Sequence, residues 1–407
     1  MNTSADMNMS PDMQTSADMQ TSNTLLAGTT FVKRLQLIGV ATTAVGIVLS
    51  VVAAMMDMER FLFDYLIAFV FWGGIGVTSV FFSMLQFLTR SGWSAAVRRI
   101  PELMGGFTPL LFILLLPIVF GVGHLYHHWV HPEPGDVILA GKQPWLNVPF
   151  FVTRLFVYVG IWVVMYFVIV GNSFRQDKSS DIKPTRRNWT LSAPITIFYG
   201  VTITFAAFDL LMSLYPHWFS TIFGVYYFAG SLVGTLAVIT IIAVFLRKAG
   251  LLGDWLTSDR MHDLGKLLFA FNVFWAYIAF SQYILIWYAD LPEEIVFFTY
   301  RFEHGWEVVS LLLLLIHFIV PFILLLSEDA KRNLNTLLAG AVILLFAHLL
   351  DMFWLVMPNY NHDAVTIGWM EFAPVIALGG IFMLATAWQF RRHHAIPVRD
   401  PFLAEAR

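Results

Sequence analysis

WFSTIFGVYYFAGSLVGTLAVITIIAVFL, residues 218–246, contains no charged residue and is followed at once by Arg247 and Lys248. A stretch of this kind crosses a bilayer as a helix, because about 20 apolar residues span the hydrocarbon core and a helix satisfies its own backbone in lipid. The other apolar runs lie at 31–56, 61–89, 102–129, 149–172, 190–214, 262–289, 301–327, 333–357 and 367–390. The sequence therefore predicts an all-α integral membrane protein with ten transmembrane helices.

The composition supports this class. Of 407 residues, 58% are hydrophobic and 13% charged, and the mean hydropathy of +0.71 leaves no soluble domain of useful size outside the spans. The chain has no cysteine, which excludes disulfides and Cys-ligated iron–sulfur clusters within it. A redox centre here would need His or Met ligands, or would be a diffusible quinone.

The Lys and Arg residues predict the orientation. Twenty of the 24 fall on the side of the N-terminus, and the other four are Arg60, Lys142, Arg154 and Arg301. By the positive-inside rule both termini are cytoplasmic, and this asymmetry reflects topology rather than nucleic-acid binding. Residues 1–30 form a polar tract in which TSADM at 3–7 recurs at 15–19. We expect a disordered cytoplasmic tail there, without the basic region of a secretory signal.

A weak internal repeat relates spans 2–5 to spans 6–9. The matches keep their order along the chain: Met104 with Met261, 110–112 with 267–269, Tyr126 with Tyr283, 150–154 with 297–301, and Asp209 and Pro216 with Asp351 and Pro358. The repeat predicts two parallel four-helix bundles at 61–217 and 218–360, with peripheral additions at 31–60 and 361–407.

The repeat places one Arg and one Asp near the outer end of each bundle. Arg154 and Arg301 begin the third helix of their units, and Asp209 and Asp351 lie about two turns below the outer end of the fourth. Ionisable residues inside a membrane indicate function by default. The alternative is a structural ion pair or an Arg that reaches toward the interface.

In the first bundle, His124, Tyr126, His127 and His128 close the second helix on the outer side. The three histidines share one helix face, which suits a proton relay, a quinone oxygen ligand or, less well, a metal. His124 is expected to lie deepest. For His127 and His128 the alternative is hydrogen bonding to lipid headgroups.

In the second bundle, Arg301, Glu303, His304 and Glu307 open span 8, and His348 and Asp351 share a face of span 9. His317 follows Arg301 by about 24 Å of helical rise, which puts it in the inner half of the membrane. With Asp263 and Lys266 at the cytoplasmic start of span 7, these groups form a ladder that could carry protons across. The alternative is a set of independent hydrogen bonds between helices. Since His317 and His348 are expected on opposite sides of the midplane, a haem held by both is not expected.

Two stretches carry a family resemblance. These are YPHWFSTIFGVYY at 215–227 and DLGKLLFAFNVFWAYIAFSQYILIWY at 263–288, the second followed by Pro292, Glu293 and Glu294. They resemble the large membrane subunits of bacterial alternative complex III, a quinol:electron-acceptor oxidoreductase, whose relatives include the NrfD-like anchor of polysulfide reductase. Of the two related subunits in such a complex, this chain looks more like the smaller.

The resemblance implies a cofactor-free subunit in the bacterial cytoplasmic membrane, embedded in lipid and without nucleic-acid partners. Its implied partners are the larger related membrane subunit, other small membrane subunits, a periplasmic iron–sulfur protein and c-type cytochromes, so haem and iron–sulfur clusters belong to the partners. By analogy with the larger sibling, a quinol (menaquinol or ubiquinol) would bind near His124, Tyr126, Arg154 and Asp209. Proton conduction or scaffolding is the alternative role for the smaller subunit.

Quinol oxidation needs a proton acceptor, which His and Asp supply, and an electron acceptor, which must dock from outside. A secondary transporter is the rival from another class, because ten spans with a repeat and buried acids also describe transporters. Against it, the spans lack the paired mid-membrane helix breaks that form a transporter site, although Pro109, Pro117, Pro194 and Pro321 keep it open. An inert membrane anchor is the third hypothesis.

Overall fold

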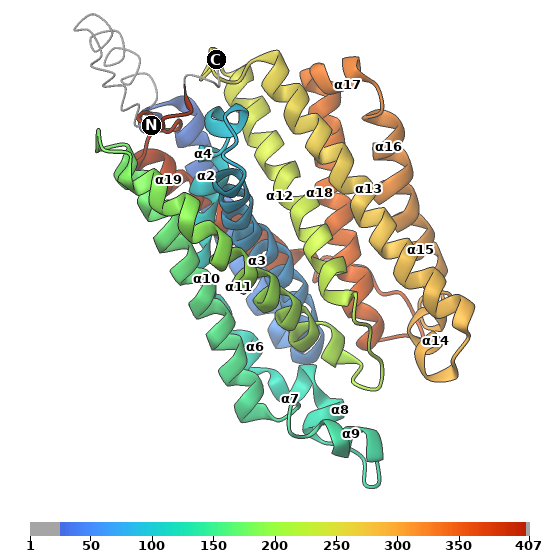
Figure 1. The fold of residues 1–407 in the computed structure, drawn as a ribbon. Helices are drawn as coiled ribbons and strands as arrows, with labels where there is room; N and C mark the ends of the chain where they lie inside the picture. Colours follow the sequence, from blue (N-terminus) through green and yellow to red (C-terminus); the bar gives the residue numbers. More distant parts are fainter. Residues whose placement is uncertain (1–24, 404–407) are drawn as a thin grey trace, which may run out of the picture.

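The computed structural model describes residues 25–403, and this part of the chain is mainly helical and contains no β-strand. Ten of its helical segments are long and apolar enough to cross a membrane (Figure 1). The predicted all-α integral membrane class is therefore confirmed. The TSADM repeat and Arg407 lie outside the described residues.

Eight of the ten spans contain one long helix each. These are α2 (Thr30–Met56), α3 (Met58–Leu88), α10 (Val148–Gln176), α11 (Lys183–Leu210), α12 (Phe223–Lys248), α13 (Ser258–Ala289), α18 (Leu334–Val356) and α19 (Phe372–Arg392). The 3₁₀ turns η3 (Met212–Leu214) and η5 (Met357–Asn359) extend α11 and α18. Short helices α9 (Val137–Lys142), α14 (Pro292–Thr299) and α17 (Glu328–Arg332) lie in loops.

Side-chain caps explain where several of the long helices begin. The Asp57 carboxylate accepts the Arg60 N–H at 2.9 Å before α3, and the Asn147 side chain accepts the Phe150 N–H at 3.0 Å before α10. Each cap satisfies one of the backbone donors that a helix leaves unpaired in its first turn. In lipid such a donor would otherwise have no partner.

The other two spans are broken. Span 3 consists of α4 (Arg99–Met104), the 3₁₀ segment η2 (Gly105–Leu110), α5 (Leu111–Leu114) and α6 (Leu116–Phe120), with Pro109 and Pro117 inside it. Span 8 consists of α15 (Trp306–Leu313), the π-helical segment η4 (Leu314–Ile319) and α16 (Val320–Leu324), which contains Pro321. Proline removes a backbone donor from the helix ladder, so both breaks have a local cause.

The two breaks do not correspond in the repeat. The repeat aligns span 8 with α10, which is one continuous helix, and aligns broken span 3 with α13, which is also continuous. Transporter sites are typically made by broken helices in matching positions of the two halves. The positions of these breaks therefore count against the transporter hypothesis.

Helices α3 and α12 form the buried centre of the molecule. Helix α3 packs against α10, α11 and span 3, while α12 packs against α13 and α18, with span 8 lying against α13 and α18. The centre is shared, because α3 also contacts α12, α18 and α19. Helix α2 packs mainly against α19, where a Cβ on Gly46 would come within 2.3 Å of the Ala377 backbone. Small residues allow such close helix contacts in membranes.

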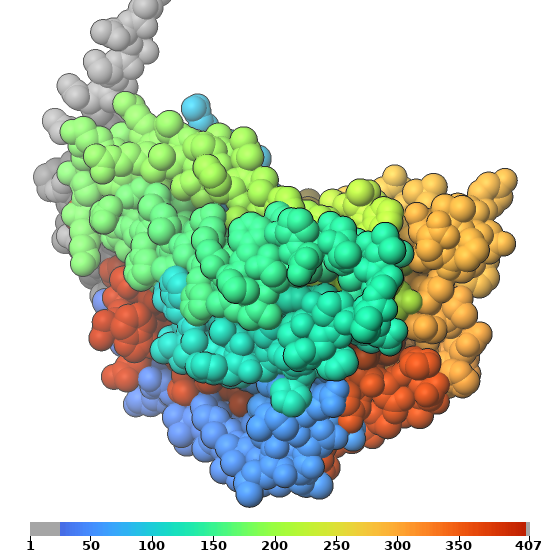
Figure 2. Space-filling model, turned by 90° about the horizontal axis from the view of Figure 1, so that it is seen from below, coloured from blue at the N-terminus to red at the C-terminus, as the bar shows by residue number. Residues whose placement is uncertain are grey.

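The molecule has two ends along the helix axes. The start of α2 and the end of α19 lie at one end, called the terminal end here, and α9 and α14 lie at the other, called the distal end (Figure 1). Seen from the distal end, the segment around residues 120–147 covers the centre of the face, and the start of α3 borders the segment that follows α18 (Figure 2).

Candidate functional site

In the first repeat unit, Arg154 and Asp209 form a fully satisfied ion pair. The Arg154 guanidinium donates from Nε and Nη2 to both Asp209 carboxylate oxygens at 2.8 Å, and Nη1 donates to the Trp145 carbonyl oxygen at 2.9 Å. The Tyr158 hydroxyl and the Trp145 indole N–H also donate to Asp209, at 2.8 and 3.1 Å. The predicted proximity of Arg154 and Asp209 is confirmed. The arrangement is that of a structural ion pair, because little acceptor capacity is left on the carboxylate.

Tyr126 contributes to the end of a helix rather than to a histidine cluster. It is fully buried, and its hydroxyl donates to the carbonyl oxygen of Leu210, the last residue of α11, at 3.0 Å. Carbonyl groups in the last turn of a helix have no partner within the helix. Tyr126 therefore caps α11 next to Asp209.

The expected common face of the three histidines is wrong. The chain leaves helical geometry at Tyr126 (φ −118°, ψ 36°), which separates α7 (Val122–Leu125) from α8 (His127–Val130). His124 is exposed, so the expectation that it lies deepest is wrong as well. His127 and His128 are also exposed, and the pKa of His128 is lowered, first by partial burial and then by the neighbouring His127. The apolar run that continued to residue 129 in sequence hid this break.

A cavity of about 250 Å³ lies beside Asp209, lined among others by Trp145, Met212 and Trp218. Ligand sites in proteins usually measure about 300 to 1,000 Å³. Its small volume and the saturated carboxylate next to it make it a weak candidate for a quinol head group.

The second unit breaks the symmetry. Arg301 is buried, but its guanidinium donates to the carbonyl oxygens of Phe297, Trp354 and Leu355 at 2.7, 3.2 and 3.1 Å. Trp354 and Leu355 belong to the last turn of α18, so Arg301 caps that helix and its charge complements the negative end of the helix dipole. The alternative of a structural ion pair does not hold in this unit, because the Asp351 carboxylate has other partners.

Asp351 instead belongs to a buried cluster with two histidines. Ligand atoms of His317, His348 and Asp351 all lie within 4.8 Å of one another, and all three residues have no exposed surface. The Asp351 carboxylate accepts a hydrogen bond from the Tyr226 hydroxyl and one from the Trp275 indole N–H at 3.1 Å. Helices α12, α13 and α18 and the π-segment η4 together build this histidine–aspartate cluster.

The imidazoles of the cluster are held by packing alone. His317 stacks on Trp275 with ring centroids 3.6 Å apart, and His348 contacts Phe71 at 5.3 Å. Within the described chain none of the four imidazole nitrogens has a hydrogen-bond partner. A buried polar group without a partner costs free energy, so four such atoms in one cluster call for an explanation.

Glycine on α12 makes room for this cluster. A Cβ on Gly230 would lie 3.0 Å from His348 Nδ1 and 3.3 Å from an Asp351 oxygen, and one on Gly234 would lie 2.7 Å from His348 Cδ2. Any larger residue at these positions would push the imidazole away from the carboxylate. The cluster therefore also depends on the small residues of α12.

The expected separation of His317 and His348 across the midplane is wrong. Span 8 begins at Trp306 rather than at Arg301, because 301–305 form a turn. His317 then lies 11 residues from the distal end of its span (317 minus 306), and His348 lies 11 residues from the distal end of its own (359 minus 348). The two imidazoles therefore meet at the same depth. Ligand atoms of both imidazoles and of Asp351 all lie within 4.8 Å of one another, so the three groups form one cluster.

Two histidines and a carboxylate are also a donor set for a divalent transition metal such as zinc or iron. A metal-bound imidazole almost always donates its second ring N–H to an acceptor that orients it. Neither imidazole has such an acceptor in the described part of the chain. The arrangement fits groups that exchange protons with water better than it fits a metal centre.

The other residues of the predicted ladder lie at the two ends of the second unit. Asp263 pairs with Lys266 at 2.8 Å and with Arg260 at 3.1 Å near the terminal end of α13. Glu303, His304 and Glu307 are exposed at the distal end, where Glu307 accepts the Gly305 N–H at 2.8 Å. These residues do not touch the cluster, and the continuous ladder is not formed by side chains alone.

Two buried polar residues were missed by the sequence analysis. Asn272 lies one turn from Trp275 on the terminal side, is fully buried, and has no hydrogen-bond partner for either amide atom among residues 25–403. Asp64 on α3 is likewise fully buried with both carboxylate oxygens unpartnered in the same range. Asp64 could have been identified from the sequence, because a charged residue inside the apolar run 61–89 indicates a functional position. It was overlooked because it has no counterpart in the repeat.

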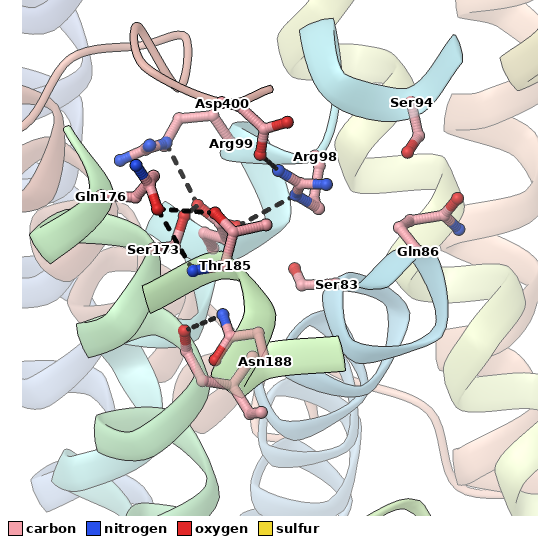
Figure 3. Close-up of polar contacts among 12 residues, drawn as sticks. Ser83, Gln86, Ser94, Arg98, Arg99, Ser173, Gln176, Thr185, Asn188 and Asp400 are labelled. Carbon is pink, nitrogen blue, oxygen red and sulfur yellow. Dashed lines mark hydrogen bonds and ion pairs between the residues drawn. The ribbon is translucent and has the colours of Figure 1, made fainter. Parts of the chain in front are cut away.

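Arg98 and Arg99 lie between the predicted apolar runs 61–89 and 102–129, and both are buried at the terminal end of span 3 (Figure 3). Arg99 forms two hydrogen bonds of 2.8 Å with Asp177, and Arg98 pairs with Asp400. The Nε atoms of Arg98 and Arg99 also lie 3.4 and 3.1 Å, respectively, from carboxylate oxygens of Glu102. Burial raises the pKa of Asp177, while the Arg99 charge opposes that rise. This network fastens the C-terminal segment to the bundle.

Comparisons with known proteins add no identification. No protein-family model matches the chain, and no curated protein matches it either.

Proposed function

We propose that this chain is a cofactor-free membrane subunit of a quinol-oxidising respiratory complex, and that its second repeat unit transfers protons. The observation that carries the proton role is the histidine–aspartate cluster, in which two unpartnered imidazoles and a carboxylate meet at mid-membrane. Imidazole and carboxyl groups exchange protons readily, and such groups inside lipid usually mark proton pathways.

The difference between the two units supports this assignment. In the first unit Asp209 is neutralised by Arg154, whereas in the second Arg301 caps α18 and leaves Asp351 to Tyr226, Trp275 and the histidines. A carboxylate locked to an arginine is a poor proton carrier, because the ion pair opposes protonation. The proton role therefore belongs to the second unit rather than to the predicted quinol site around Asp209.

A route through the second unit has its start near Asp263 and Lys266. From there Asn272 lies nine residues further along α13, about 14 Å by helical rise, and Trp275 and the cluster follow one turn later. Water must bridge these intervals, and the unpartnered amide of Asn272 offers it both a donor and an acceptor. The proton moves as hydrogen bonds are exchanged, without any redox change in this chain.

The redox part of the proposal rests on the resemblance of residues 215–227 and 263–288. It assigns the chain to the bacterial cytoplasmic membrane with both termini inside, beside a larger related subunit, other small membrane subunits, a periplasmic iron–sulfur protein and c-type cytochromes. Menaquinol or ubiquinol would be oxidised in that assembly. The electrons would pass to the partners, since this chain has no cysteine ligands.

The test begins with gentle detergent extraction of the tagged chain from its own membranes. Co-purifying c-type haem and quinol:acceptor activity support the proposal. A chain that purifies alone and exchanges a solute in vesicles would instead establish the transporter hypothesis.

The proton role is then measured in vesicles that hold the purified assembly. His348→Gln and Asp351→Asn are expected to lower proton transfer per electron, while His124→Gln, which changes an exposed histidine, leaves it intact. Unchanged proton transfer in both cluster variants would remove the proton role and leave the anchor hypothesis.

A further inference from the structure

Asp64 is a buried carboxyl group that the proposed route has not used. It lies on α3 six residues from the distal start of the helix, about 9 Å along its axis. It has no exposed surface, and neither of its carboxylate oxygens has a hydrogen-bond partner in residues 25–403. An ionised carboxylate without a donor is costly in such a place, so a lasting structural role does not account for it.

The position of Asp64 on α3 connects it to the histidine–aspartate cluster. Residues 57, 60, 64 and 71 are spaced by three, four and seven, so they share one face of the helix. Phe71 on this face contacts the His348 ring at 5.3 Å, which shows that the face looks toward α18. Asp64 therefore lies about 10 Å distal to the Phe71 contact on the same side of α3.

The same face leads from Asp64 to the distal surface. Arg60, one turn further out, pairs with Glu371, and Asp57 accepts a hydrogen bond from the Tyr360 hydroxyl at 3.0 Å. Asp57 and Tyr360 are partly exposed. On the distal face the start of α3 borders the segment after α18 (Figure 2).

We infer that Asp64 is a proton carrier between the histidine–aspartate cluster and the distal surface, with the pair Arg60 and Glu371 at the outer end of this exit. The inference rests on the proposed proton role of the cluster. A proton arriving from the cluster forms an O–H bond on one Asp64 oxygen, and that bond breaks when the proton passes to a water molecule on the distal side. No electrons are exchanged, and the carboxylate is restored for the next proton.

Phe71 and Ala68 separate Asp64 from His348 on this face, and both are buried. The transfer therefore needs water between the two sites, which a small residue at position 68 can accommodate and a large one cannot. A larger side chain at position 68 should therefore block this path while every titratable group stays in place.

The inference is tested on the purified assembly in vesicles. Asp64→Asn is expected to slow proton transfer by about 100-fold, the lower end of the rate contribution of one acid–base group, and Asp64→Glu to restore most of the rate. Glu59→Gln is the matched control, since Glu59 is an exposed carboxyl in the first turn of the same helix. Infrared difference spectra of the same samples should lose one protonated-carboxyl band in Asp64→Asn only.

Two results separate the exit from the proton role itself. If Asp64→Asn transfers protons at the wild-type rate while Asp351→Asn does not, the exit through α3 is wrong and the proton role of the cluster stands. If Asp64→Asn and Asp351→Asn both transfer protons normally, the proposed proton role is wrong and the exit falls with it. Ala68→Leu gives an independent check, because wild-type proton transfer in this variant would also contradict a water path past residue 68.

Discussion

Arg154 holds Asp209 with two hydrogen bonds of 2.8 Å, while the residues that the repeat aligns with them, Arg301 and Asp351, do not pair. The two units thus use the same residues for different purposes. In the first unit the pair joins α10 to α11. In the second unit Arg301 caps α18, and Asp351 lies beside His317 and His348.

Breaking the ion pair should affect stability rather than proton transfer. Asp209→Asn leaves the buried Arg154 charge unpaired, which we expect to cost roughly 3 to 5 kcal/mol of the free energy of unfolding. Thermal unfolding in detergent measures this. Asp351→Asn is the control, and it should unfold near the wild-type temperature, because no buried arginine loses its partner. A larger loss in Asp351→Asn than in Asp209→Asn would contradict this division of roles.

Arg301 should not be replaceable by lysine. Its guanidinium reaches three carbonyl oxygens at once, and an ammonium group presents its donors from a single point. Arg301→Lys is expected to destabilise the distal end of α18 by about 1 to 3 kcal/mol, the cost of leaving buried carbonyls unpaired. Hydrogen exchange of the last turn of α18 should speed up, while exchange in α11 stays unchanged and serves as the internal control.

His317→Phe separates the titratable nitrogen from the aromatic stack. The phenyl ring can keep the contact with Trp275, which has a centroid distance of 3.6 Å, so the fold should be retained. Proton transfer per electron is expected to fall, because the imidazole is gone. Zinc and iron contents of the purified wild-type assembly should match those of His317→Phe. A metal lost only in the variant would establish the cluster as a metal centre instead.

Gly230→Ala perturbs the cluster without removing any of its groups. The added Cβ would lie 3.0 Å from His348 Nδ1 and 3.3 Å from Asp351, so the imidazole must shift. We expect slower proton transfer with all titratable residues in place. Gly200→Ala on α11 is the control, since a Cβ there meets nothing within 4 Å. It should transfer protons normally and gain up to about 1 kcal/mol of stability from helix propensity.

His393, just beyond the last span, should make stability depend on pH. Its ring stacks on Phe174 at 3.6 Å, and its pKa is lowered from 6.5 to about 4, mainly by burial and then by nearby cations such as Arg99. Because the folded pKa lies below the unfolded one, protonation favours the unfolded chain. The contribution of neutral His393 is complete above about pH 6.5 and is lost as the pH falls toward 4. His393→Phe keeps the stack and should lack this part of the pH dependence in thermal unfolding curves; identical curves would contradict it.

The apolar runs alone determined the fold class, because a chain in lipid must satisfy its backbone within each helix and needs about 20 apolar residues to cross. The repeat also placed Arg154 beside Asp209 correctly, because the depth of a residue in a regular helix follows from its position in the sequence. Depth was predicted wrongly for His317, because the sequence does not show that the turn at 301–305 delays the start of the span. Likewise, nothing in the run 102–129 marked the break at Tyr126 that turns His124 outward.

Only the tertiary structure decided which buried groups meet. Whether Asp351 faces Arg301 or the histidines depends on how α18, η4 and α12 rotate against one another, and that rotation is set by packing at Gly230 and Gly234 rather than by any local preference. The burial of Arg98 and Arg99 depends on distant partners at residues 177 and 400. Residue type and spacing fix what a helix can offer on each face, but the partner across the interface is chosen when the helices pack.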